Sequence, residues 1–363
     1  MKRLGSKINL QIYHHPYETE IRNCGVQEKF VKPTNHVAQM YRPLDETPLT
    51  MVNTGLSLDL MISELKKAAE VAVDLEHHAY RSYLGFTCLM QISTRNQDYI
   101  VDTLALREEL YKLNVITTDE NIVKVFHGGQ ADILWLQKDL GAGFENESKN
   151  FKISHKIRKY FWKKSKLKVS NIFEYFSNTT FGIYVVNMFD TFHASKKLQL
   201  PKHSYDFLLQ HYCKVRVDKR YQLADWRVRP IPAEMLRYAR EDTHYLLYIF
   251  DRLRIDLEQK AIGNVRQVFQ RSREVSLQKF EKPIFTEESY LKVYKKKNRK
   301  EFNSQQLEAF RKWVAPCVVL ISNDSLAMSV VFQWLFLIRT RMSRTVHWHR
   351  KVEFLCWFWR NCE

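Results

Sequence analysis

The chain has 363 residues, of which 45% are hydrophobic and 27% are charged. This length holds one large domain or two modest ones, and the composition excludes a wholly disordered chain. The formal net charge of +17 indicates a polyanionic partner, most often nucleic acid, although a basic protein without such a partner has the same composition.

The predicted elements begin after an arm over residues 1–50, which carries four prolines and little periodicity. In chain order, the pattern predicts a helix over 58–69, strands over 71–75, 88–94 and 98–102, a helix over 104–113, and a strand over 122–126. A helix over 131–139, a strand over 184–189, and a helix over 233–257 that begins after Pro232 follow. Strands that alternate with helices predict an α/β fold, and the three closely spaced early strands allow a mixed sheet.

Two segments differ from the rest in composition. Residues 142–182 are rich in Lys, Phe, Asn and Ser and have no amphipathic period, which predicts a surface insert within the domain. The tail from residue 313 carries five of the eight tryptophans. Its apolar run over 326–338 is shorter than the roughly 20 residues that a membrane-spanning helix needs, so no membrane partner is expected. The six cysteines form no CxxC pair and indicate reduced thiols in an intracellular protein.

Two acids at the end of a predicted strand carry the first functional signal. Asp74 and Glu76 are two positions apart, so both side chains point to one face of the sheet. Two acids that leave an apolar strand on one face are costly unless a cation neutralises them, and a divalent metal does so. The alternative is that they cap the end of a strand at the surface.

Two further acids lie on predicted helices. Asp132 follows the strand that ends at Phe126 and opens a helix, where the helix dipole favours an aspartate with no other role. Asp242 lies one helical turn after Tyr238, so a carboxylate and a phenol share one face, as they also would in a simple surface contact. The four acids together predict an oxygen-rich cage for two Mg²⁺ or Mn²⁺ ions, as used for displacement at phosphorus.

Three ordered motifs resemble those of the DEDD exonuclease superfamily. They are Val73–His78, Phe126–Gly128 with Asp132–Leu136, and Tyr238–Asp242. A tyrosine four residues before the last aspartate marks the RNase D branch of that superfamily. The strings Cys88–Thr94 and Tyr221–Arg227 resemble the RNase-D-like catalytic subunits of the nuclear RNA exosome. The likeness runs from about residue 15 to 310, apart from the insert.

The resemblance assigns roles to individual residues. It implies that Asp74, Glu76, Asp132 and Asp242 are catalytic metal ligands and that Tyr238 orients the attacking water. It places His77, Trp135 and Lys219 near the terminal nucleotide, where Trp135 would stack on a base and Lys219 would meet a phosphate. Each of these three also has a structural interpretation, as a strand-end histidine, a core aromatic and a solvated lysine. Asp190 matches the family as a structural or supporting residue.

The resemblance also implies a domain plan. It predicts an RNase H-like mixed sheet flanked by helices, as an exonuclease domain over 51–262 that contains the insert. A linker and the start of a helical HRDC domain, the helicase-and-RNase-D C-terminal type, follow over 263–312. The insert and the tail over 313–363 match no family pattern, which suggests intron sequence read through into protein.

The implied function is a 3′→5′ exoribonuclease that removes nucleoside 5′-monophosphates from single-stranded RNA 3′ ends by a two-metal mechanism. The implied partners are the core subunits of the nuclear exosome, in RNA processing and decay that includes ribosomal RNA, in the nucleus and above all the nucleolus. Two alternatives stay open. One is a catalytically impaired RNA-binding or scaffolding subunit of the exosome, and the other is a DNA exonuclease of the same superfamily.

Overall fold

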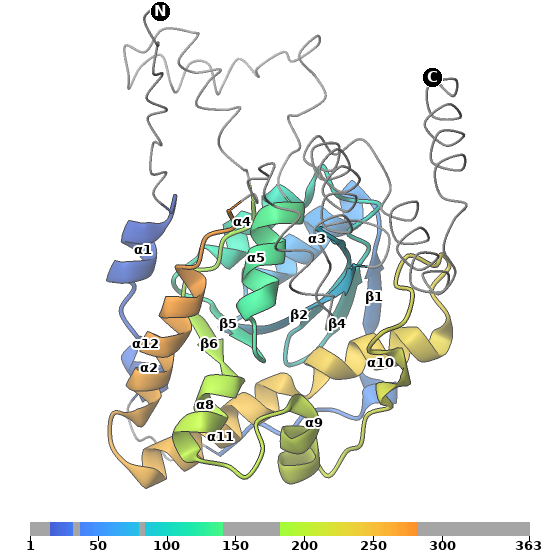
Figure 1. Ribbon diagram of the computed structural model, residues 1–363. Helices are drawn as coiled ribbons and strands as arrows, with labels where there is room; N and C mark the ends of the chain where they lie inside the picture. The colour runs from blue at the N-terminus through green and yellow to red at the C-terminus, as the bar shows by residue number, and fades with distance from the viewer. Residues whose placement is uncertain (1–14, 32–36, 80–83, 141–181, 282–363) are drawn as a thin grey trace, which may run out of the picture. The chain divides into compact units, whose positions relative to one another are not determined.

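The computed structural model describes residues 15–31, 37–79, 84–140 and 182–281 (Figure 1). The predicted HRDC domain, the tail and nearly all of the predicted insert lie outside these residues. Residues 86–281 and the described residues up to 78 form one compact unit. In the described part of the chain, no helix is both long enough and apolar enough to cross a membrane.

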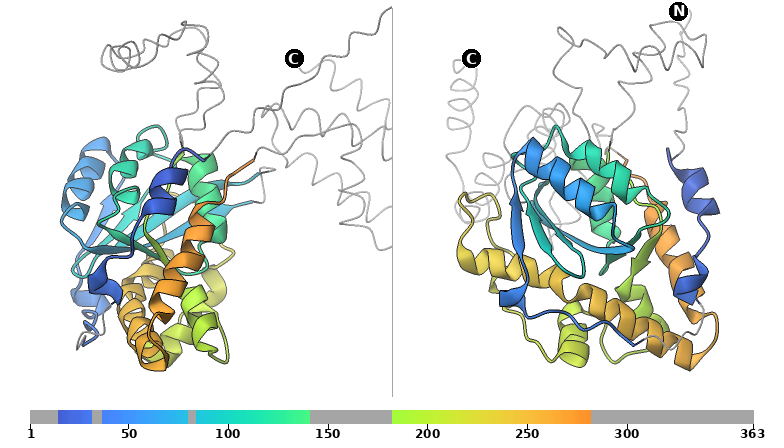
Figure 2. Two further views of the ribbon diagram at one scale, coloured as in Figure 1. Left: turned by 90° about the vertical axis from the view of Figure 1, so that its left-hand side faces the viewer. Right: turned by 180° about the vertical axis from the view of Figure 1, so that it is seen from behind.

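A mixed sheet organises this unit, with helices on both of its faces (Figures 1 and 2). Its strands are β1 (Leu49–Val52), β2 (Glu70–His78), β3 (Phe86–Ser93), β4 (Asp98–Val101), β5 (Val123–Phe126) and β6 (Met188–Asp190). Their order across the sheet is β1-β4-β3-β2-β5-β6. Strand β3 pairs antiparallel with β2 and β4, whereas β1 with β4, β2 with β5, and β5 with β6 are parallel. The predicted mixed sheet flanked by helices is therefore confirmed.

Ten α-helices and four shorter helical turns accompany the sheet in the described residues. The α-helices are α1 (Glu18–Asn23), α2 (Glu28–Val31), α3 (Gly55–Leu65), α4 (Asn114–Thr117), α5 (Gln130–Asp139), α8 (Thr191–Leu198), α9 (Tyr205–Leu208), α10 (Ala233–His244), α11 (Leu246–Lys260) and α12 (Asn264–Ser276). Shorter helical turns are η1 (Leu44–Glu46), η2 (Leu110–Leu113), η3 (Leu209–Cys213, π-helical) and η4 (Lys219–Tyr221). The predicted helices over 58–69 and 131–139 correspond to α3 and α5.

Several predicted elements need correction. The helix predicted over 104–113 is mostly turn, because the Asp102 carboxylate accepts the backbone N–H groups of Leu104 and Ala105 and bends the chain there. The strand predicted over 184–189 is shorter and shifted to β6. The single helix predicted over 233–257 breaks at Tyr245 into α10 and α11.

The predicted arm and linker are also more structured than expected. The arm contains α1 and α2, and strand β1 begins before residue 50, where short local patterns are too weak to reveal it. Residues 264–276, at the start of the predicted linker and HRDC region, form α12, which packs on β6, α8 and α5 through buried Val268, Phe269 and Val275. Arg273 on α12 also donates to the backbone carbonyls of Arg22 and Cys24 in the arm.

Strand β2 separates the two largest apolar clusters of the unit. Val71, Val73 and Leu75 point into the cluster that α3 and α5 cover. Ala72 points to the opposite face, against α11 and its neighbours. By the same period of two, Asp74 and Glu76 leave the sheet on the face of Ala72, toward α10 and α11.

The two flanks of residues 141–181 come together at the end of α5. Gly182 runs so close to Gln137 that a Cβ atom on it would lie 2.5 Å from the Gln137 carbonyl oxygen, and its own carbonyl accepts from Asn114. Ile183 N–H donates to the carbonyl of Leu136 at 3.0 Å. Gly182 is therefore part of the folded unit, although the predicted insert included it.

Replacing 141–181 with a short Gly-Ser linker is expected to keep the exonuclease activity that the resemblance implies and to leave the melting temperature equal or higher. The flanks are already adjacent, and closing a shorter loop costs less entropy. Thermal unfolding and RNA degradation by the shortened chain check this expectation. A clear loss of activity in a chain that still melts cooperatively would show that the segment has a function.

Lys124 on β5 is fully buried, and its Nζ donates to the carbonyl of Asp119 at 2.6 Å. Burial lowers the pKa of Lys124 from 10.5 to about 7, so between these values the unfolded chain binds the extra proton and stability rises with pH. We expect the free energy of unfolding of the wild type, relative to that of Lys124→Met, to increase by about 1–3 kcal/mol between pH 6.5 and pH 9.5. Urea unfolding of both chains measures this gain, and a difference independent of pH would contradict it.

Candidate active site

Asp74 and Glu76 lie in the centre of the sheet, because β2 is flanked by β3 on one side and β5 on the other. Glu76 is buried, whereas Asp74 keeps part of its surface open. Gln91, the cross-strand partner of Asp74, donates from Nε2 to Glu76 Oε1 at 3.4 Å. A β-bulge between Glu76 and His77 then shifts the register, and bulges commonly re-aim side chains beside active sites.

Asp132 is held by a tight turn between β5 and α5. Gly128 has a φ of +67°, which favours glycine, and a Cβ atom on Gly129 would lie 2.8 Å from Met188 Cε. The Asp190 carboxylate accepts both glycine N–H groups, at 2.8 and 3.1 Å, and it also caps α8 through Phe192 N–H. Asp190 therefore holds the glycine loop that precedes α5 and so positions buried Asp132 at the start of that helix. This is a structural role for Asp190.

Tyr238 and Asp242 lie one turn apart on α10, and both keep part of their surface open. The Tyr238 ring lies 6.0 Å from Trp226 and 6.1 Å from Tyr221, measured between ring centroids. The opposite face of α10 is anchored to the sheet. There Asp98 on β4 accepts from Arg240 Nε at 2.6 Å and from His244 Nδ1 at 2.9 Å. These two bonds fix the rotation of α10 about its axis, so Tyr238 and Asp242 lie on the face that does not contact Asp98.

Three of the four predicted acids converge. Carboxylate oxygens of Asp74, Glu76 and Asp242 all lie within 4.8 Å of one another. Asp132 is not part of that group, but its pKa is raised by burial first and then by the charge of Asp74. Burial raises the pKa of Asp74 to about 7. The pKa of Glu76 is raised by burial and by the charges of the other three acids.

These residues fit a divalent metal. Carboxylate oxygens are the hard ligands that Mg²⁺ and Mn²⁺ prefer. Buried acids that raise one another's pKa destabilise the fold when ionised, and a cation between them removes that cost. The chemistry of the donor set therefore matches a metal site, which the sequence predicted from Asp74, Glu76 and Asp242 among others.

His77 and Trp135 form a stacked pair. Their ring centroids are 4.2 Å apart and their planes are 6° from parallel. Burial, and then the charge of Lys138, lower the pKa of His77 to about 4, so its ring is neutral at neutral pH. Asp139, whose carboxylate lies 3.9 Å from His77 Nε2, also accepts the N–H and hydroxyl of Thr87. One face of Trp135 is thus covered by a neutral imidazole.

Lys219 is not in contact with this pair and pairs with a residue of another helix. It is exposed at the start of η4, and its Nζ lies 3.0 Å from Asp206 Oδ2 on α9. No contact between Lys219 and the four acids is recorded among the described residues. The ion pair instead joins η4 to α9.

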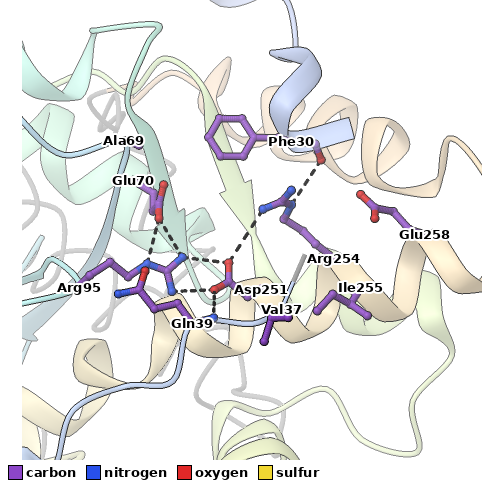
Figure 3. Close-up of a pocket in the computed structure, with 10 residues that line it drawn as sticks. All are labelled: Phe30, Val37, Gln39, Ala69, Glu70, Arg95, Asp251, Arg254, Ile255 and Glu258. Atoms are coloured by element: carbon purple, nitrogen blue, oxygen red, sulfur yellow. Dashed lines mark hydrogen bonds and ion pairs between the residues drawn. The ribbon is translucent and has the colours of Figure 1, made fainter. Parts of the chain in front are cut away.

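A cavity of about 240 Å³ lies at the other end of β2, beside Glu70 (Figure 3). Arg95 fills much of it and pairs with Glu70 and Asp251. Arg254 donates to the backbone carbonyl of Phe30. Because Arg95, Glu70 and Asp251 pair with one another there and the cavity lies at the strand end opposite the acids, this cavity is not the catalytic site.

The sequence did not single out two residues that support the acids. Gln91 is the one strongly polar residue in the run 88–92 of β3, and that break in the apolar pattern was the available signal. Tyr205 on α9 donates from its hydroxyl to the backbone carbonyl of Glu241 at 3.0 Å. No local pattern reveals that bond, because its partners are 36 residues apart in the chain.

Comparisons with known proteins agree with this geometry. A family model described as a 3′-5′ exonuclease matches residues 49–258. The chain is 46% identical over 312 residues to exosome complex component 10 of Rattus norvegicus and 44% identical over 308 residues to that of Homo sapiens. Each match covers 84% of this chain and 30% of the relative. The exosome complex exonuclease RRP6 of Saccharomyces cerevisiae is 40% identical over 269 residues, or 74% of this chain and 31% of the relative.

A solved structure extends the likeness to the fold. The catalytic core of RRP6 from Trypanosoma brucei matches with a TM-score of 0.69 and 37% identity, over 85% of this chain and 73% of that chain. The chain spans about 30% of the length of the curated relatives it matches. The predicted likeness to RNase-D-like exonucleases is confirmed by the family model and these relatives, and the chain belongs to the 3′-5′ exonuclease family.

Proposed function

We propose that the chain is a 3′→5′ exoribonuclease that hydrolyses single-stranded RNA from its 3′ end and releases nucleoside 5′-monophosphates. The observation that carries this proposal is the convergence of Asp74, Glu76 and Asp242 beside buried Asp132 in a chain of the exonuclease family. RNA is favoured over DNA by the likeness to exosome exonucleases and not by the acids, which would serve either substrate.

The four acids would hold two divalent ions, Mg²⁺ or Mn²⁺. When bound, these ions supply activation of the attacking water and stabilisation of the leaving oxygen. Tyr238 would hold and orient that water. Burial, followed by the charges of Asp242, Glu76 and Asp74, raises the pKa of Tyr238, so its phenol stays neutral and can donate or accept a hydrogen bond.

Substrate contacts would involve His77, Trp135 and Lys219. The terminal base would stack on the face of Trp135 that His77 leaves uncovered, with the neutral imidazole holding the indole in place. Lys219, exposed on η4, would exchange its Asp206 partner for a backbone phosphate. The net charge of +17 favours approach of RNA in general.

The relatives named for the exosome also suggest partners and a location for this chain. We propose that the chain acts with the core subunits of the exosome in the nucleus, including the nucleolus, in the processing and decay of RNA such as ribosomal RNA. The domain plan stays part of the proposal, with an HRDC-type domain beginning after α12 and an atypical tail over 313–363.

The test is degradation of a 5′-labelled single-stranded RNA with Mg²⁺, with Mn²⁺ and with EDTA. A ladder that shortens from the 3′ end and disappears with chelator supports the proposal. A folded chain that binds RNA equally with and without chelator, and forms no product, supports the scaffolding alternative instead. A DNA strand of the same sequence, added as competitor, separates the ribonuclease from a DNA exonuclease.

A further inference from the structure

The helix that carries Asp242 is interrupted three residues after it. Helix α10 ends at His244, and the backbone N–H of Tyr245 is directed to the carbonyl of Thr243. In a regular helix that N–H would bond the carbonyl four residues earlier, which belongs to Glu241. The turn at Tyr245 therefore alters the helical hydrogen bonding at the Glu241 carbonyl, which directly precedes Asp242 in the chain.

Tyr205 gives this carbonyl a donor from outside the helix. Its hydroxyl donates to the Glu241 carbonyl at 3.0 Å from α9, a different element. Because a buried carbonyl is costly to leave without a donor, this bond stabilises the interrupted form of the helix. The bond thus fixes the backbone on the N-terminal side of the break, one residue from Asp242.

The same tyrosine reaches toward the other side of the site. Its ring lies 5.4 Å from His127, between centroids, at the turn that leads from β5 to Asp132. His127 is itself held there by a 2.9 Å contact between Nδ1 and Thr191 Oγ1. Burial, and then the charge of Asp242, raise the pKa of Tyr205, in keeping with a side chain next to the acids.

We infer that Tyr205 is a positioning residue for metal binding, which sets the distance of Asp242 from the acids on β2 by bonding the Glu241 carbonyl. It acts through the backbone and does not touch the reacting atoms. This inference rests on the proposed metal-dependent nuclease and adds a residue to it. Groups that orient metal ligands from behind usually change metal affinity or activity by about 10–100-fold when removed.

The test compares Tyr205→Phe with Tyr212→Phe. Tyr212 donates its hydroxyl to Asp256 Oδ2 at 2.6 Å, so the control also removes a tyrosine bond to the α10–α11 region, but one remote from Asp242. Phenylalanine keeps the ring packed against His127, so the fold should survive. Calorimetry and electron paramagnetic resonance with Mn²⁺ alone give the metal affinity, and steady-state kinetics give kcat and KM for RNA.

For Tyr205→Phe we expect the Mn²⁺ dissociation constant to rise about 10-fold, with kcat reduced at limiting Mn²⁺, KM for RNA unchanged, and most of the turnover restored at saturating Mn²⁺. Tyr212→Phe should match the wild type in Mn²⁺ affinity. Wild-type affinity in Tyr205→Phe, or an equal shift in both variants, overturns the inference while leaving the nuclease intact. A wild-type chain that neither binds Mn²⁺ nor shortens RNA overturns the proposed function as well.

Discussion

Replacing Asp242 with asparagine is expected to lower the rate of RNA shortening by at least about 10³-fold, the upper range for loss of one preorganised electrostatic group. The amide keeps the shape of the side chain but removes a charge from the group of three acids whose oxygens lie within 4.8 Å. The RNA ladder with Mg²⁺, at equal concentrations of variant and wild type, measures the loss. The exposed Asp59→Asn on α3 is the matched control and should retain full activity.

The same substitution should stabilise the metal-free protein. Burial and the charge of Asp74 raise the pKa of Asp242, so ionisation at neutral pH penalises the folded state, and the penalty grows as pH rises above the ordinary aspartate range. In EDTA, Asp242→Asn should therefore gain about 1–2 kcal/mol in unfolding free energy. Adding Mg²⁺ should stabilise the wild type, by about 2.7 kcal/mol at 100 times its dissociation constant, and the variant far less. An inactive variant that is equally stabilised by Mg²⁺ would show that Asp242 is not a ligand.

Asp98→Ala is expected to destabilise the fold by about 3–5 kcal/mol, the range for breaking a buried ion pair by removing one partner. Asp98 is almost fully buried and accepts from Ser93, Arg240 and His244. Without it, the Arg240 guanidinium stays buried with no carboxylate. Urea unfolding measures the loss, and Asp59→Ala, which breaks an exposed pair with Lys112, should change stability little.

The loss should depend on pH in a defined direction. Burial alone would raise the pKa of Asp98, but hydrogen bonds and charge from His244 and Arg240 outweigh it and lower that pKa. A lowered carboxylate pKa contributes stability above the ordinary aspartate value and loses it on acidification. The difference between wild type and Asp98→Ala should therefore be complete at neutral pH and shrink in acid. A small, pH-independent difference would contradict the role given to this network.

Features with strong local patterns were predictable from the sequence. The apolar segments before Asp74 and before the glycine turn fit few secondary structures other than a strand. Tyr238 and Asp242 share one helical face because of helix geometry alone. The resemblance then joined acids from distant segments into one expected site. The structure brings Asp74, Glu76 and Asp242 together, with Asp132 beside Asp74.

What the sequence could not supply depends on contacts between distant segments. The break at Tyr245 has no Gly or Pro to mark it, and the Glu241 carbonyl at that break is satisfied by a hydroxyl from α9. The turn after Asp102 replaces a helix because Asp102 caps the chain locally and also binds Arg229 from more than 100 residues away. Such bonds override local propensity, which spans only tenths of a kcal/mol per residue.

The cover that α10 provides has a consequence for biosynthesis. Met235 and Ala239 on α10 cover Cys88, Leu89 and Ile100 on β3 and β4. The ribosome adds Met235 and Ala239 more than 100 residues after Ile100. At about 5–20 residues per second, that apolar sheet face emerges roughly 7–30 s before its cover is made. During this interval the nascent chain exposes an apolar surface and is prone to aggregate. The yield of folded protein should therefore depend on translation speed and on chaperone capacity.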